Sequence, residues 1–138
     1  MSILLEAEHL TKIFTQRGKN PFKAVNDVSF TLERGETLGI VGESGCGKST
    51  FGKTVMMLEK PTGGEVLFNY NGEYKDITKF NKDEMFEFRK KVQMVFQDPY
   101  SSLNPRLSVF DLIAEPLTNI EEYRKDKKKL DARVREMM

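Results

Sequence analysis

The sequence predicts an α/β fold, and three observations carry the prediction. Apolar and polar residues alternate over residues 28–32, as they do in a half-buried antiparallel strand. The apolar run over residues 37–41 does not alternate, which indicates a strand covered on both faces, as in a parallel sheet. After a glycine-rich loop, apolar residues recur at helical spacing over residues 51–58. Strand, loop and helix are therefore expected in succession.

Composition and charge limit the classes of function. The chain has 138 residues, of which 38% are hydrophobic and 31% charged, values typical of one modest globular domain. Its 22 basic and 21 acidic residues nearly cancel, so we expect no nucleic-acid partner. Cys46 is the one cysteine, the start lacks the pattern of a signal peptide, and no apolar stretch is long enough to span a membrane. These features predict a cytoplasmic protein whose membrane association goes through a partner.

Residues 1–35 are expected to form an antiparallel β subdomain. Residues 3–14 mix apolar and polar side chains without helical period, and the turn-rich residues 16–21 separate them from the alternating residues 28–32. This pattern favours two antiparallel strands joined by a turn.

Residues 36–97 are expected to form part of an α/β core that includes a β hairpin. Asn71-Gly72 is a strong hairpin turn signal because both residues tolerate positive φ. Asn81 is a candidate cap for a helix over residues 82–90. The apolar residues 92–96 then predict a second buried strand, which Asp98-Pro99 ends.

Residues 98–138 are expected to begin a helical subdomain. Residues 109–117 carry apolar side chains at helical spacing, and residues 121–138 form a highly charged helical stretch whose surface is mostly solvated.

A phosphate-binding loop is the most specific motif of the chain. Residues 42–49, GESGCGKS, fit the Walker A pattern G-x-x-x-x-G-K-[ST]. Its glycines allow turns that point backbone N–H groups at phosphate oxygens, and the helix that follows adds the positive end of its dipole. We expect Lys48 to reach the β- and γ-phosphates of ATP, the Ser49 hydroxyl to ligate Mg²⁺, and Thr50 to bind the α-phosphate. The residues expected to contact the nucleotide in this loop are Gly42, Glu43, Ser44, Gly45, Cys46, Gly47, Lys48, Ser49 and Thr50.

Two alternatives belong to this motif. A glycine-rich turn matches the pattern by accident about five times in a thousand chains of this length, from average residue usage. The strand expected before the loop and the helix expected after it argue against an accident. Cys46 leaves two interpretations open: a redox-sensitive thiol near a helix N-terminus, or a small residue at an unconstrained position.

Two segments resemble the ATP-binding subunits of the oligopeptide/dipeptide (peptide/nickel) ABC importer family. They are residues 42–50, GESGCGKST, and residues 95–106, VFQDPYSSLNPR. The resemblance covers essentially the whole chain, and the ending of the second segment, Asn104-Pro105-Arg106, points to the peptide and nickel branch. It implies the N-terminal part of one ABC ATP-binding domain: a P-loop NTPase core with an antiparallel β subdomain and the start of a helical subdomain, incomplete.

The same resemblance implies roles for Gln97 and Phe14. Gln97 corresponds to the Q-loop glutamine, a catalytic residue with Lys48, which contacts Mg²⁺ and the attacking water and links nucleotide state to the transmembrane partner. A neutral amide can ligate the ion and bind water without adding charge. Phe14 falls at the aromatic position that stacks on adenine, although it could instead pack between strands. Residues 100–106 are a candidate surface for the membrane subunit, or an ordinary turn-rich loop.

Other parts of the family's catalytic machinery are not found in residues 1–138. These parts are the LSGGQ signature, the Walker B aspartate with its glutamate, and the switch histidine. His9 precedes the Walker A motif and is interpreted as a strand histidine, whereas residues 107–111, LSVFD, are better explained as a helix start than as a Walker B. We expect this chain alone to bind ATP and Mg²⁺ without hydrolysing ATP, while the parent subunit is an ATPase.

The resemblance also implies partners. The subunit would lie at the cytoplasmic face of the membrane, bind transmembrane permease subunits, pair head to tail with a second ATP-binding subunit, and act indirectly with a substrate-binding protein. Other interpretations remain open: a non-hydrolysing nucleotide-binding or interaction module, or an importer of another solute such as nickel. An ABC-type ATPase acting on DNA is disfavoured by the near-zero net charge.

Overall fold

The structure is a computed structural model that describes residues 2–98 and 102–138. It divides into two compact units, Met1–Met94 and Val95–Met138. Within the described ranges, no helix is both long enough and apolar enough to cross a membrane. The subdivision into residues 1–35, 36–97 and 98–138 stays a prediction.

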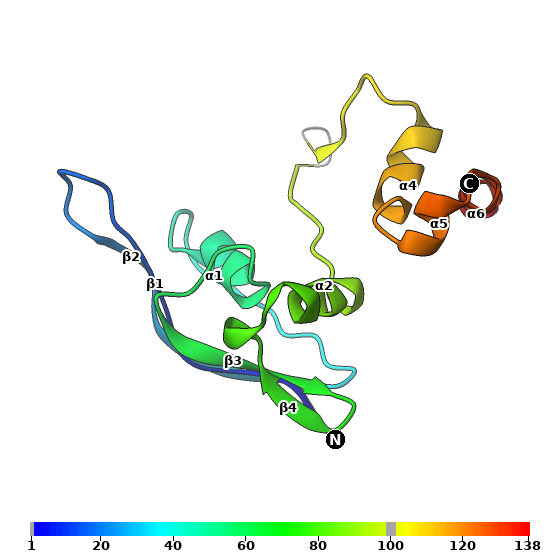
Figure 1. The fold of residues 1–138 in the computed structure, drawn as a ribbon. Coiled ribbons are helices and arrows are strands. Elements are labelled where there is room, and N and C mark those ends of the chain that lie inside the picture. Colours follow the sequence, from blue (N-terminus) through cyan, green and yellow to red (C-terminus); the bar gives the residue numbers. More distant parts are fainter. Residues whose placement is uncertain (1, 99–101) are drawn as a thin grey trace. The chain divides into compact units, whose positions relative to one another are not determined.

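A four-stranded antiparallel sheet forms the base of the first unit, in the order β2-β1-β3-β4 (Figure 1). β1 (Ile3–Phe14) and β2 (Phe22–Glu33) form a long ribbon, which confirms the antiparallel pair expected at the start of the chain. β3 (Gly63–Tyr70) pairs with the other edge of β1, and β4 (Glu73–Asp76) pairs with β3. The two central strands, β1 and β3, thus come from segments far apart in the sequence.

The hairpin between β3 and β4 forms at the predicted turn. Asn71 and Gly72 have φ values of 56° and 99°, both in the left-handed region. The buried Asn69 side chain supports the turn, because its Oδ1 accepts from Gly72 N at 2.7 Å while its Nδ2 donates to the Ile3 carbonyl at 3.0 Å. One amide therefore ties the turn to the start of β1.

α2 (Lys82–Lys91) begins at the predicted cap, after the short 3₁₀ helix η1 (Ile77–Lys79). Asn81 Oδ1 accepts from the N–H groups of Asp83 and Glu84 at 2.9 and 3.0 Å, and Glu84 Oε2 accepts from Asn81 N at 2.9 Å. This reciprocal arrangement satisfies N–H groups that a helix start leaves without partners, and such caps stabilise a helix by about 1 kcal/mol.

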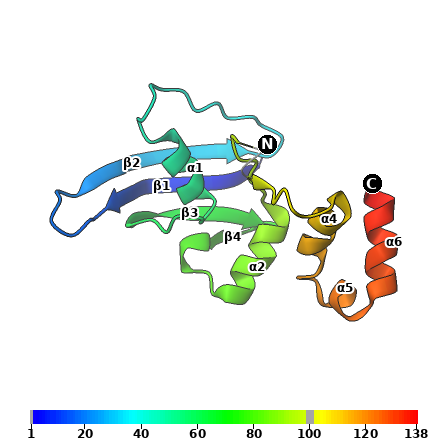
Figure 2. The same cartoon turned by 90° about the horizontal axis from the view of Figure 1, so that it is seen from above.

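The core lies on one face of the sheet, which α1 (Lys48–Val55) and α2 cover together (Figures 1 and 2). Phe51 of α1 packs edge to face on Phe30, with ring centroids 5.3 Å apart. Phe88 of α2 packs in the same way on Phe68, also at 5.3 Å. Aromatic pairs in this geometry add attraction beyond the area they bury, so each helix is anchored to the sheet by one ring. The buried core residues are Leu5, Ala7, Leu10, Val25, Phe51, Val66, Phe68, Ile77 and Phe88.

Two irregular positions bend the β1-β2 ribbon. His9 and Asp27 have φ values of 51° and 55°, and the pairing register shifts around them. His9 Nδ1 lies 2.7 Å from Asp27 Oδ1, and this hydrogen bond raises the pKa of His9 above its ordinary value. His9 is therefore within a strand, as interpreted from the sequence, but at an exposed bulge rather than at a regular position.

The two predicted core strands are the main correction to the expected fold. Residues 37–41 and 92–96 are irregular rather than strands, and Val41 and Val95 are 93% and 95% exposed. A strand needs hydrogen-bonding partners along its backbone, and the four-stranded sheet of the described residues pairs neither segment. The expected burial was wrong as well, because Leu38, Ile40 and Phe96 are also exposed. Apolar composition favours burial but does not supply the neighbouring strands that burial requires.

α4 (Val109–Leu117) of the second unit covers the residues predicted to be helical. Ser108 Oγ accepts from Asp111 N at 3.1 Å, and the Asp111 carboxylate accepts from Ser108 N at 3.4 Å. The segment at residues 107–111 is thus a capped helix start, as expected, and not a Walker B strand.

The charged stretch at the C-terminal end forms two helices instead of one. α5 (Glu121–Lys125) and α6 (Lys127–Met137) meet at Asp126, whose Oδ1 accepts from Lys128 N and Lys129 N at 3.0 and 3.1 Å. An aspartate with extended backbone is a favourable helix cap, so a new helix begins there.

Candidate functional site

The glycine-rich loop leads directly into the start of α1. Gly45 and Gly47 have φ values of 81° and 100°, and Gly47 is the N-cap residue directly before α1. No side chain caps this helix start. The first N–H groups of α1 are therefore left for a ligand, and the helix dipole favours an anion at that place.

Gly47 also touches the sheet. A Cβ at this position would lie 2.1 Å from the carbonyl oxygen of Ala24 in β2, so only glycine fits. Ala24 thus sets the position of the loop through its backbone. Sequence reasoning missed Ala24, because nothing in the residues around it signals a contact with a loop more than twenty positions away.

Lys48 folds back over the loop. Its Nζ donates to the carbonyl oxygens of Gly42 and Glu43 at 2.7 and 2.6 Å, and lies 3.6 Å from Cys46 Sγ. A Cβ on Gly42 would come within 2.8 Å of that sulfur. The ammonium group is therefore hydrogen-bonded to the loop and lies among the residues that are predicted to bind phosphate.

Ser49 and Thr50 lie in the first turn of α1. The Ser49 side chain is exposed, and the Thr50 carbonyl accepts from Thr54 Oγ1 at 2.7 Å. The described part of the chain holds no group of three histidine, cysteine or acidic side chains suited to a metal ion. An exposed hydroxyl next to a phosphate site fits Mg²⁺, which takes oxygen ligands and often uses few protein groups beside phosphates and water.

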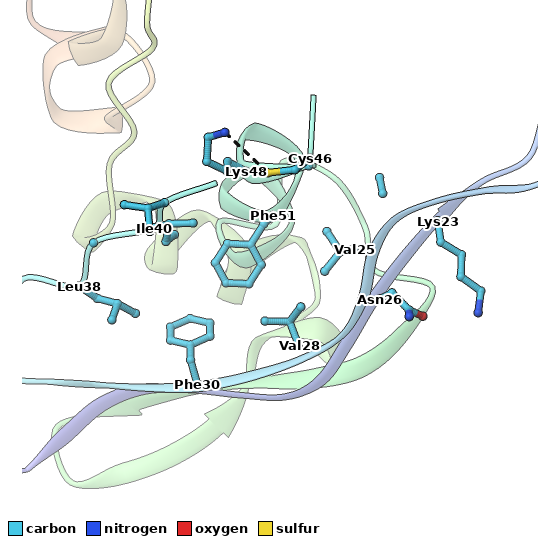
Figure 3. Close-up of a pocket in the computed structure, with 14 residues that line it drawn as sticks. Lys23, Val25, Asn26, Val28, Phe30, Leu38, Ile40, Cys46, Lys48 and Phe51 are labelled. Carbon is cyan, nitrogen blue, oxygen red and sulfur yellow. Dashed lines mark hydrogen bonds between the residues drawn. The ribbon is translucent and has the colours of Figure 1, made fainter. Parts of the chain in front are cut away.

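A pocket of about 540 Å³ lies beneath the loop (Figure 3). Phe30, Val28 and Phe51 form its apolar part, and Lys48 and Cys46 lie at its edge. The irregular residues 38–41 line one side of it. An apolar pocket of this kind does not suit phosphate groups, which would bind instead at the backbone of the loop and the start of α1.

Phe14 is the last residue of β1, opposite Phe22 of β2. Its ring is 41% exposed and belongs neither to the buried core nor to the pocket beneath the loop. The exposed ring is open to a ligand, while its stacking on adenine stays a prediction.

Gln97 belongs to the second unit, whereas the loop at residues 42–50 belongs to the first. Gln97 is exposed and sits at a bend, and its role toward Mg²⁺ and water stays a prediction. Of the candidate partner surface at residues 100–106, Tyr100 and Ser101 lie outside the described residues. In the rest, Asn104 Oδ1 accepts from Arg106 N at 3.0 Å, which makes a local turn.

The comparison with protein families decides the membership of this chain. The family model described as "ABC transporter" matches residues 25–138, which include the loop, α1 and the whole second unit. The chain belongs to the ABC transporter family.

Two relatives within the family carry names from peptide transport. The chain is 52% identical over 136 residues to the oligopeptide transport ATP-binding protein OppF of Bacillus subtilis strain 168, across 98% of this chain and 43% of that protein. It is 53% identical over 95 residues to the dipeptide transport ATP-binding protein DppF of Escherichia coli K12, across 69% and 27%. The resemblance to these importers that the motifs indicated is confirmed. The chain spans less than half the length of these relatives.

Solved ABC cassettes share the fold. A dimeric post-hydrolysis state of the ATP-binding cassette MJ0796, bound to ADP and Pi, superposes with a TM-score of 0.71 at 25% identity, over 96% of this chain and 55% of that one. The cbiO1 protein of Clostridium perfringens gives a TM-score of 0.63 at 26% identity, over 91% and 47%. The predicted partial ABC ATPase fold is confirmed.

Proposed function

We propose that this chain binds ATP with Mg²⁺ through residues 42–50, as part of the ATP-binding subunit of an oligopeptide or dipeptide importer. The observation that carries the proposal is the start of α1: an uncapped helix N-terminus held against β2 through Gly47, with Lys48 folded over the loop before it. Such an arrangement offers backbone N–H groups, a helix dipole and one cation to a polyphosphate.

Each residue of the loop has a distinct part in this proposal. Lys48 exchanges its two loop carbonyls for the β- and γ-phosphate oxygens, to which an ammonium binds more strongly because they are charged. The Ser49 hydroxyl ligates Mg²⁺, and Thr50 binds the α-phosphate. Bound Mg²⁺ supplies neutralisation of the charge on the transferring phosphoryl group. Gln97 would add the second protein ligand and orient water.

The partners proposed for this chain are inferred from the names and structures of its relatives. OppF and DppF are named as transport ATP-binding proteins, and the MJ0796 cassette is dimeric. We therefore propose a second ATP-binding subunit, transmembrane permease subunits, an indirectly coupled substrate-binding protein, and a place at the cytoplasmic face of the membrane. A nucleotide-binding module without turnover and a nickel importer are the alternatives that the tests must exclude.

The phenyl ring of Phe14 is expected to contribute to nucleotide affinity through its exposed face. Phe14→Ala should weaken binding of Mg-ATP and Mg-GTP alike, by about 5- to 150-fold, because aromatic stacking on a base is worth about 1–3 kcal/mol and distinguishes bases poorly. Titration calorimetry on the purified chain measures both constants. Phe22→Ala, which removes the ring opposite on β2, is the matched control. If Phe14→Ala binds both nucleotides as tightly as the wild type, Phe14 has a packing role only.

Peptide uptake tests the transport part of the proposal. In cells that depend on this subunit for import, Lys48→Ala should reduce uptake of a labelled oligopeptide by more than about tenfold, since phosphoryl transfer relies on charge stabilisation at the γ-phosphate. Nickel uptake is measured in parallel. Loss of nickel uptake with normal peptide uptake would replace the peptide assignment by the nickel alternative.

A further inference from the structure

Lys12 lies against one face of the Phe14 ring. The two residues are separated by one position on β1, so their side chains leave the strand on the same side. Lys12 Nζ lies 4.9 Å from the centroid of the ring. This distance is within the range in which a cation is attracted to an aromatic face. One face of Phe14 is thus occupied within the chain itself.

Lys12 is held in this position by the turn that follows α1. Its Nζ donates to the Lys60 carbonyl at 2.8 Å and forms an ion pair with Glu59 Oε2 at 3.2 Å. The side chain of Lys12 is only 12% exposed, although Phe14 beside it is 41% exposed. A lysine with two such partners and little exposure is fixed in one conformation, in contrast to a surface lysine that moves freely in water.

The backbone of β1 on either side of Lys12 is held by hydrogen bonds to Thr62. Thr62 N donates to the Thr11 carbonyl at 2.8 Å, and Thr62 Oγ1 accepts from Ile13 N at 3.1 Å. These bonds do not involve the Lys12 side chain. A change at Lys12 therefore alters what lies behind the ring without removing the hydrogen bonds that hold the strand.

We propose that Lys12 is a positioning residue for Phe14, which backs one face of the ring and leaves the other face as the only one on which a base can stack. The inference rests on the proposed nucleotide site, because it requires Phe14 to be the stacking residue. A ring that is already held loses less freedom on binding, so affinity gains from the preorganisation. The cation behind the ring also draws its π electrons away from the open face, which favours an electron-rich purine there.

The test compares a nucleotide with a ligand that has no base. Affinities for Mg-ATP and for Mg-tripolyphosphate are measured by titration calorimetry on the wild type, Lys12→Met, Lys12→Arg, Glu59→Gln and Phe14→Ala. Lys12→Met keeps a long side chain but removes the charge, and we expect it to weaken ATP binding by about 3- to 10-fold. Lys12→Arg should restore the wild-type affinity within about twofold, because guanidinium also stacks on aromatic faces.

Three further results separate positioning from a general structural effect. Tripolyphosphate affinity should be unchanged in Lys12→Met and in Phe14→Ala, and Lys12→Met should add no further loss when Phe14 is already alanine. Glu59→Gln removes one of the two contacts that hold Lys12, so it should weaken ATP binding less than Lys12→Met does and leave tripolyphosphate affinity unchanged.

The outcomes that overturn the inference are distinct from failure of the nucleotide site. If Phe14→Ala loses ATP affinity and Lys12→Met does not, Phe14 stacks without help from Lys12. If Lys12→Met weakens ATP and tripolyphosphate equally, its effect is structural. If Phe14→Ala itself leaves ATP affinity unchanged, base stacking by Phe14 is wrong and the inference falls with it, whereas ATP binding through Lys48 is judged separately by the tripolyphosphate result.

Discussion

Replacing Gly47 with alanine is expected to disrupt the phosphate loop and to abolish measurable ATP binding. The residue has a φ of 100°, and a Cβ there would lie 2.1 Å from the Ala24 carbonyl oxygen and 3.3 Å from its carbon. A backbone strained in this way costs about 1–3 kcal/mol, and forcing an extra methyl group against packed atoms costs about as much again. Since the obstacle is backbone of β2, the loop itself must move away from the sheet, and the start of α1 moves with it.

Substitutions at two other glycines distinguish the cost of backbone strain from the cost of the steric clash. Gly45→Ala meets no atom within 4 Å but has a φ of 81°, so it should show only the conformational cost of about 1 kcal/mol. Gly39→Ala has open space and no positive φ, and it should behave as the wild type. Chemical denaturation gives the free energy of unfolding, and calorimetry with Mg-ATP gives the affinity. Wild-type values for both quantities in Gly47→Ala would show that the loop does not pack on Ala24.

Lys48→Ala is expected to weaken Mg-ATP binding by about 10- to 150-fold. The substitution removes a charge-assisted hydrogen bond to phosphate, and hydrogen bonds to charged groups are worth about 1.5–3 kcal/mol. The bonds from Lys48 Nζ to the Gly42 and Glu43 carbonyls belong to the free protein and are exchanged on binding, so their loss does not add to this cost. The substitution acts on the phosphate end, so binding of Mg-tripolyphosphate should weaken together with that of ATP, in contrast to Phe14→Ala.

A second lysine of α1 provides the matched control. Lys53 lies in the last turn of the same helix, so Lys53→Ala removes one positive charge from α1 at the other end from the loop. Its ATP affinity should stay within about twofold of the wild type, because solvent and salt screen a charge at that distance. Circular dichroism on both variants checks that the helices remain. Equal losses in the two variants would mean that Lys48 acts through net charge, and no loss in either would contradict the phosphate assignment.

The parts of the fold that were predicted correctly carry their signals within a few residues. Asn81 was predicted to cap α2 and does so, and residues 107–111 were predicted to start a helix and do so at α4. The structure adds that both starts are reciprocal caps, with Glu84 and Asp111 three positions after Asn81 and Ser108. Asn71-Gly72 forms a hairpin turn because its residues tolerate the required φ. The helix after the glycine-rich loop, α1, also forms where helical spacing predicted it, whereas phosphate binding by the loop stays a prediction.

The sequence by itself therefore determined the hairpin turn, the cap at Asn81, the helix starts of α1 and α4, and the family to which the chain belongs. Only the tertiary structure decided whether residues 37–41 and 92–96 form strands. A strand requires a hydrogen-bonded neighbour, and a local pattern of apolar residues does not identify that neighbour. The tertiary structure also decided that Gly47 meets Ala24 and that Lys12 lies behind Phe14. The physical reason is the same in each case: a local pattern records the conformation and burial that a residue favours, whereas a contact depends on which distant segment the fold brings to it.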